Sequence, residues 1–145
     1  MPIETYYLQN YFCFSDLSEA QQNAVAQLAT AECFLPGYVL FEEGKPGEHL
    51  YALVNGQVEI LYDIGENPPT RVDLVSGDEI IGCCTLVPPY LYTHTARSLT
   101  EIEVLEIDAE ALRNLMREDL PLGFAIQQQV MRVLLDRIVD FRLGI

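Results

Sequence analysis

Positive charge is scarce in this chain. Its 145 residues include Lys45 as the single lysine and eight basic residues in all, against 22 acidic residues, and the net charge is −14. Because the summed field of such a surface repels polyanions, we expect no binding of nucleic acid by this chain.

Long apolar runs are missing as well. No stretch approaches the roughly 18 consecutive apolar residues that a membrane-spanning helix requires. Residues 1–5 show neither the basic start nor the apolar segment of a secretory signal. We therefore expect a cytoplasmic protein that does not interact with membranes. At 145 residues, half of them apolar, we expect residues 1–145 to form a single domain with its own core.

Motifs for metal binding and catalysis are also absent. The chain has four cysteines: Cys13, Cys33, Cys83 and Cys84. None of them has CxxC spacing, so we expect free thiols and neither a metal nor a redox centre. His49 and His94 are not spaced as a pair of metal ligands, and we interpret both as ordinary strand or turn residues. Without a nucleophile–base pair, a glycine-rich nucleotide loop or a zinc motif, we expect no enzymatic activity and no cofactor.

Helix signals stand at both ends of the chain. Ser18, with Gln21 three residues later, forms a capping box that predicts a helix through about residue 28. Asp108 is placed to cap a second helix, and Pro121 can open a third.

The middle of the chain, from about residue 33 to residue 107, has the short alternating runs of strands. Asn55-Gly56 lies between two such runs, which predicts a tight hairpin. Strands that are this short and evenly spaced are typical of a sandwich or a roll.

The last predicted helix carries an apolar face. Its members are Phe124, Val130, Val133, Leu134, Ile138 and Phe141. The face fits packing on the chain's own strands, and it also fits a two-fold helix-to-helix seam between two copies. We expect a homodimer through this helix, with the first arrangement as the alternative.

Three motifs carry a resemblance to a known family. They are LPGYVLFEEG at residues 35–44, PGEHLY at 46–51 and NGQVEI at 55–60. In this order and spacing the chain resembles the cyclic nucleotide-binding domain family, from about residue 11 to residue 137. The resemblance implies an α+β fold, a double-stranded β-helix (jelly-roll) barrel flanked by N-terminal and C-terminal helices. Its transcription factors, similar to catabolite activator protein, carry a DNA-binding domain after the long C-terminal helix. Since this sequence ends at Ile145, we expect a sensor domain without one.

The phosphate-binding cassette of that family is degenerate here. In the family a glutamate in the pattern G-E-x-A holds the ribose hydroxyl, and an arginine in the pattern R-[ST]-A pairs with the cyclic phosphate. The corresponding positions are Cys83 and Tyr92. A neutral thiol and a phenol supply neither a carboxylate acceptor nor a bidentate cation. Arg97, five residues beyond Tyr92, is a candidate displaced anchor but lies out of register.

The resemblance places six residues at the ligand pocket: Gly82, Cys83, Cys84, Thr85, Tyr92 and Thr93. Because a hydrogen bond to a charged group contributes about 1.5–3 kcal/mol, two such losses predict weak or lost binding of cyclic AMP and cyclic GMP. We therefore expect a stand-alone sensor or regulatory module that responds to a neutral or weakly anionic small molecule, whose binding shifts the C-terminal helices. The alternative is a protein-interaction or dimerisation module, with an unknown protein partner and a pocket that Tyr92 fills.

Overall fold

The computed structural model describes residues 8–63, 65, 68–77 and 79–142. The 3-10 helix η1 (Phe12–Phe14) and helix α2 (Glu19–Ala26) precede the strands, the 3-10 helix η2 (Cys83–Leu86) interrupts them, and helices α3 (Ala109–Glu118) and α4 (Leu120–Arg142) follow. The strands are β1 (Ala29–Phe34), β2 (Val39–Phe41), β3 (His49–Asn55), β4 (Val58–Tyr62), β5 (Thr70–Val75), β6 (Ile80–Ile81), β7 (Thr95–Ser98) and β8 (Ile102–Asp108).

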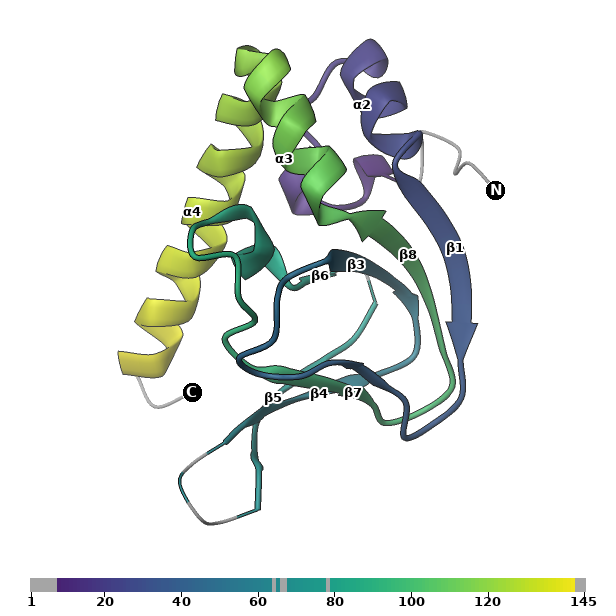
Figure 1. Cartoon of the computed structure of the whole chain (residues 1–145), viewed down its shortest axis with the longest axis vertical. Helices are drawn as coiled ribbons and strands as arrows, with labels where there is room; N and C mark the ends of the chain where they lie inside the picture. The colour runs from purple at the N-terminus through teal and green to yellow at the C-terminus, as the bar shows by residue number, and fades with distance from the viewer. Residues whose placement is uncertain (1–7, 64, 66–67, 78, 143–145) are drawn as a thin grey trace.

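In the described part of the chain, the strands form two four-stranded sheets with the orders β1-β8-β3-β6 and β2-β7-β4-β5. All of the strand pairs are antiparallel. The chain passes repeatedly from one sheet to the other, which is the connectivity of a jelly roll. Figure 1 shows α2 and α3 at the end of the roll opposite the β4–β5 connection, with α4 along one side. The predicted α+β jelly roll flanked by helices is confirmed.

The predicted helix signals act as expected. Ser18 Oγ accepts a hydrogen bond from the Gln21 backbone N–H at 3.2 Å, and Gln21 Oε1 accepts one from the Ser18 N–H at 2.9 Å. Asp108 Oδ1 accepts from the Ala111 N–H at 2.9 Å and so caps α3. Helix α4 begins one residue before Pro121, where a proline costs no intrahelical hydrogen bond.

The predicted hairpin at Asn55-Gly56 is wrong. Strand β3 pairs with β6 and β8, whereas β4 pairs with β5 and β7, so this turn joins the two sheets. Gly56 has a φ of 96°, and a Cβ atom there would lie 2.4 Å from the Glu101 carbonyl oxygen. The Gln57 N–H donates to Thr100 Oγ1 at 3.0 Å, so the β7–β8 connection holds the turn. Alternation marks an inward-facing strand on either side of the turn, but it does not say which sheet the strand joins.

Among the described residues, the buried apolar side chains form two clusters. The first, which we call the helix core, lies between the helices and the β1-β8-β3-β6 sheet and includes Phe14, Leu50, Leu105, Leu112, Leu122 and Ile126. The second, the roll core, lies between the two sheets and includes Phe41, Leu53, Val58, Ile60, Tyr92 and Ala96. Strand β3 contributes to both cores, because its alternate residues point to opposite faces of the sheet.

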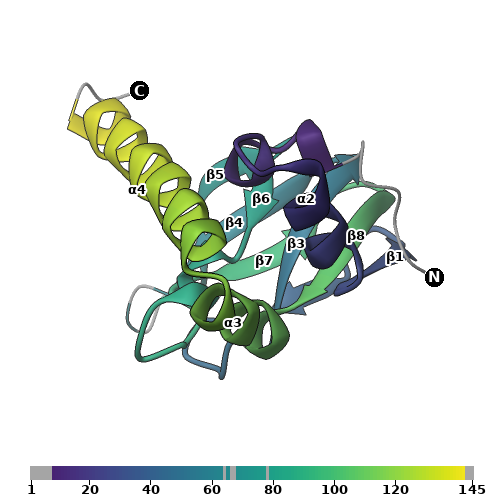
Figure 2. The ribbon, with the colours of Figure 1, turned by 90° about the horizontal axis from the view of Figure 1, so that it is seen from above.

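Helix α4 has a buried stripe and an exposed one. Leu122, Ile126 and Val130 are buried. The exposed apolar residues of α4 are Leu120, Phe124, Met131, Leu134, Leu135, Ile138 and Val139. The predicted apolar face is therefore divided, with Val130 inside and Phe124, Leu134 and Ile138 outside; the Phe141 side chain lies outside the described positions. Figure 2 shows α4 extending away from the roll. Within the described ranges, no helix combines the length and apolar character needed to cross a membrane.

Candidate functional site

The cassette begins at a glycine with left-handed backbone geometry. Gly82 has a φ of 90°, which side-chain-bearing residues rarely adopt. Its carbonyl oxygen accepts hydrogen bonds from the Thr85 N–H at 3.1 Å and from the Thr85 hydroxyl at 2.8 Å. Thr85 is fully buried. These bonds close η2 as a short turn between β6 and the loop that follows.

The two adjacent cysteines of η2 face opposite cores. Cys83 packs against the helix core, and Cys84 packs against the roll core that contains Tyr92. Hydrogen bonding from the Cys83 side chain lowers the pKa of Cys13 in η1 by more than burial raises it. The prediction from the sequence considered only spacing along the chain, and it missed this contact between residues that are distant in sequence.

Tyr92 occupies the position of the family's arginine and is buried, with 6% of its surface exposed. Its hydroxyl donates to the His49 carbonyl oxygen at 2.7 Å and accepts from the His49 N–H at 3.0 Å. Its ring stacks on Phe41, with centroids 4.0 Å apart and planes 5° apart. Burial raises the pKa of Tyr92, so the hydroxyl stays protonated near neutral pH and remains able to donate.

Further aromatic rings surround this pair. Phe41 contacts Tyr51 at a centroid distance of 6.1 Å and the edge of His94 at 5.2 Å. Burial also raises the pKa of Tyr51. Thr93 is exposed, and its hydroxyl oxygen lies 3.1 Å from His94 Nδ1. We call the rings of Phe41, Tyr51, Tyr92 and His94 the aromatic stack.

A cleft of about 420 Å³ opens beside the aromatic stack. Its lining residues are Val39, Leu40, Phe41, Glu42, Lys45, Pro46, Glu48, His49, Tyr51 and Tyr92. Tyr92 is the predicted pocket residue in this set. The other five do not line the cleft. Gly82 lies next to the Phe41 ring, and Cys84 packs against the roll core. Thr85 is buried in η2, Cys83 faces the helix core, and Thr93 is exposed. The role of all six in ligand binding stays a prediction.

Helix α3 holds the far end of the cassette through two arginines that the sequence did not single out. Arg113 Nη1 donates to the Thr85 carbonyl oxygen at 2.7 Å, and its guanidinium carbon lies 4.4 Å from the centroid of the Tyr90 ring. Arg117 Nη2 donates to the Tyr90 hydroxyl at 3.3 Å. A displacement of η2 would therefore act directly on α3.

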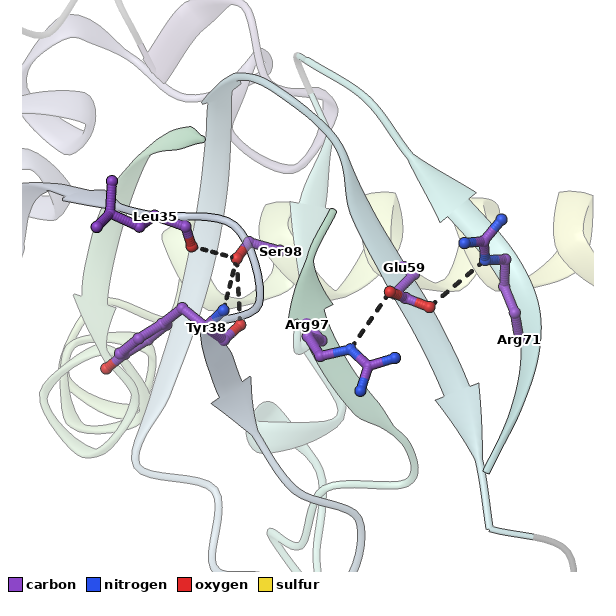
Figure 3. A network of polar contacts seen from close by, with 6 residues as sticks. All are labelled: Leu35, Tyr38, Glu59, Arg71, Arg97 and Ser98. Carbon is purple, nitrogen blue, oxygen red and sulfur yellow. Dashed lines mark hydrogen bonds and ion pairs between the residues drawn. The ribbon is translucent and has the colours of Figure 1, made fainter. Parts of the chain in front are cut away.

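Arg97 lies away from the aromatic stack. Ala96 points into the roll core, so the next side chain along β7 points outward. Arg97 Nε donates to Glu59 Oε2 at 3.3 Å, and Arg71 Nε lies 3.5 Å from Glu59 Oε1 (Figure 3). Figure 3 also shows Ser98, whose hydroxyl donates to the Leu35 carbonyl oxygen at 2.7 Å. The Arg97 side chain is thus part of an ion-pair network on the outer face of the sheet.

Comparisons with known proteins agree with the fold and the motifs. The cyclic nucleotide-binding domain model matches residues 31–119, more than half of the chain. The CRP-like cAMP-activated global transcriptional regulator of Mycobacterium tuberculosis is 29% identical over 105 residues, which cover 72% of this chain and 45% of the regulator. The matched region therefore spans less than half of that regulator's length.

Solved structures agree with this assignment. A candidate cyclic nucleotide-binding protein from Geobacter metallireducens GS-15 superposes with a TM-score of 0.85 at 28% identity, covering 94% of this chain and 98% of that one. The sensor domain of the transcriptional regulator DNR from Pseudomonas aeruginosa has the same fold, with a TM-score of 0.76, 19% identity, and coverage of 94% and 91%. The chain belongs to the cyclic nucleotide-binding domain family.

Proposed function

We propose that this chain is a non-enzymatic regulatory interaction module whose nucleotide pocket is filled by its own side chains and whose binding of cyclic AMP and cyclic GMP is weak or lost. The observation that supports this proposal is the environment of Tyr92. At the position of the phosphate-pairing arginine, a buried phenol is bonded to the His49 backbone through two hydrogen bonds and stacked on Phe41. The proposed location is the cytoplasm, where its four cysteines stay reduced under ordinary conditions.

The size of the loss supports weak or absent nucleotide binding. Removing a carboxylate acceptor and a guanidinium donor forfeits about 1.5–3 kcal/mol each. The sum, about 3–6 kcal/mol, weakens a dissociation constant by about 10²- to 10⁴-fold. A nucleotide would also have to displace the Tyr92 ring and break both of its hydrogen bonds to His49, which weakens binding further.

The exposed stripe of α4 supports self-association. Leu135 is 62% exposed, Ile138 55% and Leu134 49%, and these residues lie within little more than one helical turn. A contiguous apolar surface on an extended helix is typical of a helix-to-helix interface. A two-fold seam between two copies of α4 would bury this stripe in both of them. Homodimerisation through α4 is therefore part of the proposal.

The cleft beside the aromatic stack favours a second candidate function, a ligand-responsive sensor. Its volume of about 420 Å³ lies within the range for small-molecule sites. Lys45 lines it together with Glu42 and Glu48, so a neutral or weakly anionic ligand fits its charge better than a nucleotide does. Binding there would act on Tyr92, and the contact of Arg113 with the cassette would pass a movement of η2 to α3.

Sedimentation velocity with a matched pair of variants tests the dimer. Leu135→Glu places a charge on the exposed stripe of α4, and Leu35→Glu places the same charge at another exposed leucine, in the β1–β2 turn. We expect the wild type and Leu35→Glu to sediment as dimers and Leu135→Glu as a monomer. A monomeric wild type, or a dimeric Leu135→Glu, contradicts dimerisation through α4.

Native mass spectrometry separates the two functions. The interaction module predicts the mass of the chain alone or of its dimer. The sensor predicts a co-purified small molecule that is lost when Lys45→Glu changes the charge of the cleft. A co-purified small molecule in the wild type would contradict the interaction module and support the sensor.

A further inference from the structure

A second cleft, of about 470 Å³, lies where the end of the cassette meets the junction of α3 and α4. Its lining residues include Leu86 and Tyr90 of the cassette, Arg113 and Arg117 of α3, and Leu120 and Phe124 of α4. None of its lining residues borders the cleft beside the aromatic stack. It is therefore a separate site, which we call the arginine cleft.

The charge of the arginine cleft is opposite to that of the whole chain. The net charge is −14, yet the described residues that line the cleft include two arginines and no acidic residue. Arg113 and Arg117 stand four positions apart on α3, where like charges repel one another. In the part of the chain that the structure describes, Arg71 and Arg97 form ion pairs with Glu59, whereas neither cleft arginine has a carboxylate partner. An anion supplied from outside the chain would relieve this repulsion.

Each cleft arginine keeps unused hydrogen-bond donors. Arg113 Nη1 donates to two backbone carbonyl oxygens, at 2.7 and 3.4 Å, and its guanidinium carbon lies 4.4 Å from the centroid of the Tyr90 ring. Arg117 donates to Asn114 Oδ1 at 3.1 Å and to the Tyr90 hydroxyl at 3.3 Å. Since a guanidinium carries five N–H groups, each side chain has about three that these bonds do not use. Both side chains are therefore held in place with donors left over for a ligand.

Tyr90, which both arginines contact, has a strained backbone. Its φ is 61°, a left-handed conformation that bulky side chains rarely adopt. The Gly47 N–H donates to the Tyr90 carbonyl oxygen at 2.7 Å, and the Tyr90 N–H donates to the Val87 carbonyl oxygen at 2.9 Å. Such conformations persist where neighbouring contacts impose them, and they concentrate at binding sites. The result is a Tyr90 side chain that holds Arg113 and Arg117 at the cleft.

The α4 side of the arginine cleft is apolar and open to solvent. Leu120 is 71% exposed and Phe124 is 64% exposed, and the two side chains are neighbours one helical turn apart. The residues proposed for the dimer begin at Leu134, about 15 Å further along α4 than Phe124. Leu120 and Phe124 therefore form an apolar surface of their own beside the two cations.

We propose that the arginine cleft binds a small organic anion that consists of a carboxylate on an aromatic body. The carboxylate accepts hydrogen bonds from Arg113 and Arg117, because the planar guanidinium matches its two oxygens. The aromatic body covers Leu120 and Phe124, and a cleft of about 470 Å³ lies within the range for such ligands. Because Arg113 also donates to the Thr85 carbonyl oxygen of η2, the bound anion connects the cassette to both helices.

Isothermal titration calorimetry with 2-naphthoate tests this proposal, and 2-naphthamide is the neutral control of similar shape. Arg117→Gln removes a cation of the arginine cleft, and Lys45→Gln removes the same charge from the cleft beside the aromatic stack. Phe124→Ala reduces the apolar surface, and Met131→Ala makes a comparable change at an exposed residue of α4 that does not line the cleft. All four side chains are exposed, and circular dichroism checks that each variant is folded.

We expect the wild type to bind 2-naphthoate with a dissociation constant of about 10–100 μM, which is reasonable for a ligand of this size. Losing a hydrogen bond to a charged group weakens affinity about 10- to 100-fold. Binding of 2-naphthamide to the wild type, and of 2-naphthoate to Arg117→Gln, should therefore be at least about 10-fold weaker. Phe124→Ala should weaken binding of 2-naphthoate by about 5-fold or more. Lys45→Gln and Met131→Ala should bind it as the wild type does.

The absence of saturable binding of 2-naphthoate below about 1 mM overturns the proposal. Equal affinities for the acid and the amide overturn it as well, and so do equal affinities of Arg117→Gln and Lys45→Gln for the acid. The titration involves neither cyclic nucleotides nor the oligomeric state, so its outcome is separate from that of the proposed function. An anion bound this weakly also dissociates during purification, which distinguishes it from the co-purified molecule that the sensor predicts.

Discussion

Removing one oxygen atom tests whether Tyr92 is held in the pocket. Tyr92→Phe keeps the ring and therefore its stacking on Phe41, with centroids 4.0 Å apart. It deletes the hydroxyl that donates to the His49 carbonyl at 2.7 Å and accepts from the His49 N–H at 3.0 Å. The variant thus isolates the polar attachment of the ring from its apolar packing.

The expected cost follows from those two bonds. A typical intramolecular hydrogen bond contributes about 0.5–1.5 kcal/mol net, so losing two lowers the free energy of unfolding by about 1–3 kcal/mol. Most of this cost arises because the His49 amide and carbonyl stay partly buried without their partner. For a chain of this length, the melting temperature should fall by about 3–10 °C.

Urea denaturation and differential scanning calorimetry measure this cost. The matched control is Tyr62→Phe, because Tyr62 is 44% exposed on β4 and its hydroxyl can face solvent. The control should stay within about 0.5 kcal/mol of the wild type. If Tyr92→Phe and Tyr62→Phe unfold at the same denaturant concentration as the wild type, the hydroxyl of Tyr92 does not anchor the ring and the reasoning is refuted.

Three other substitutions test contacts around the site, each by equilibrium denaturation. Arg113→Met removes the hydrogen-bond donor and the cation that hold the cassette on α3, and it should lower the free energy of unfolding by about 1–3 kcal/mol. Unchanged stability would show that these contacts do not stabilise the fold. Glu59→Gln leaves two half-exposed arginines without their shared carboxylate, and it should lower the free energy of unfolding by about 1–2 kcal/mol, less at high salt. The control is Glu101→Gln in an exposed loop, which should change the free energy of unfolding little. Gly56→Ala and Gly37→Ala both place a side chain at positive φ, but only the Cβ atom at position 56 would meet a carbonyl oxygen, at 2.4 Å. Gly56→Ala should therefore lower the free energy of unfolding by at least about 2 kcal/mol more than Gly37→Ala does. Equal losses would contradict the close packing of the β3–β4 turn.

The fold was predictable because its signals are local. The capping box at Ser18 predicts a helix through about residue 28, and α2 ends at Ala26; the cap at Asp108 marks the start of α3. The strand partners of β3 were not predictable from Asn55-Gly56, because a turn that joins two sheets and a turn within one sheet carry the same residues and the same alternation on either side.

Of the six residues that the sequence predicted for the ligand pocket, Tyr92 lines the cleft beside the aromatic stack. The motif resemblance identified Tyr92 as the substituted arginine position, and chemistry alone suggested a ring that fills the pocket. The opposite directions of Cys83 and Cys84 depend on how η2 sits between two cores, which no local pattern encodes. The contact of Cys83 with Cys13 and the hold of Arg113 on the cassette are long-range consequences of packing.

Isothermal titration calorimetry of the wild-type protein with cyclic AMP and cyclic GMP tests the central claim most directly. An intact site with a dissociation constant of about 1 μM, weakened by at least about 10²-fold, leaves a value above about 0.1 mM. The filled pocket therefore predicts no heat beyond dilution at micromolar nucleotide. Saturable binding with a micromolar dissociation constant would show that the nucleotide displaces Tyr92, and it would contradict the account.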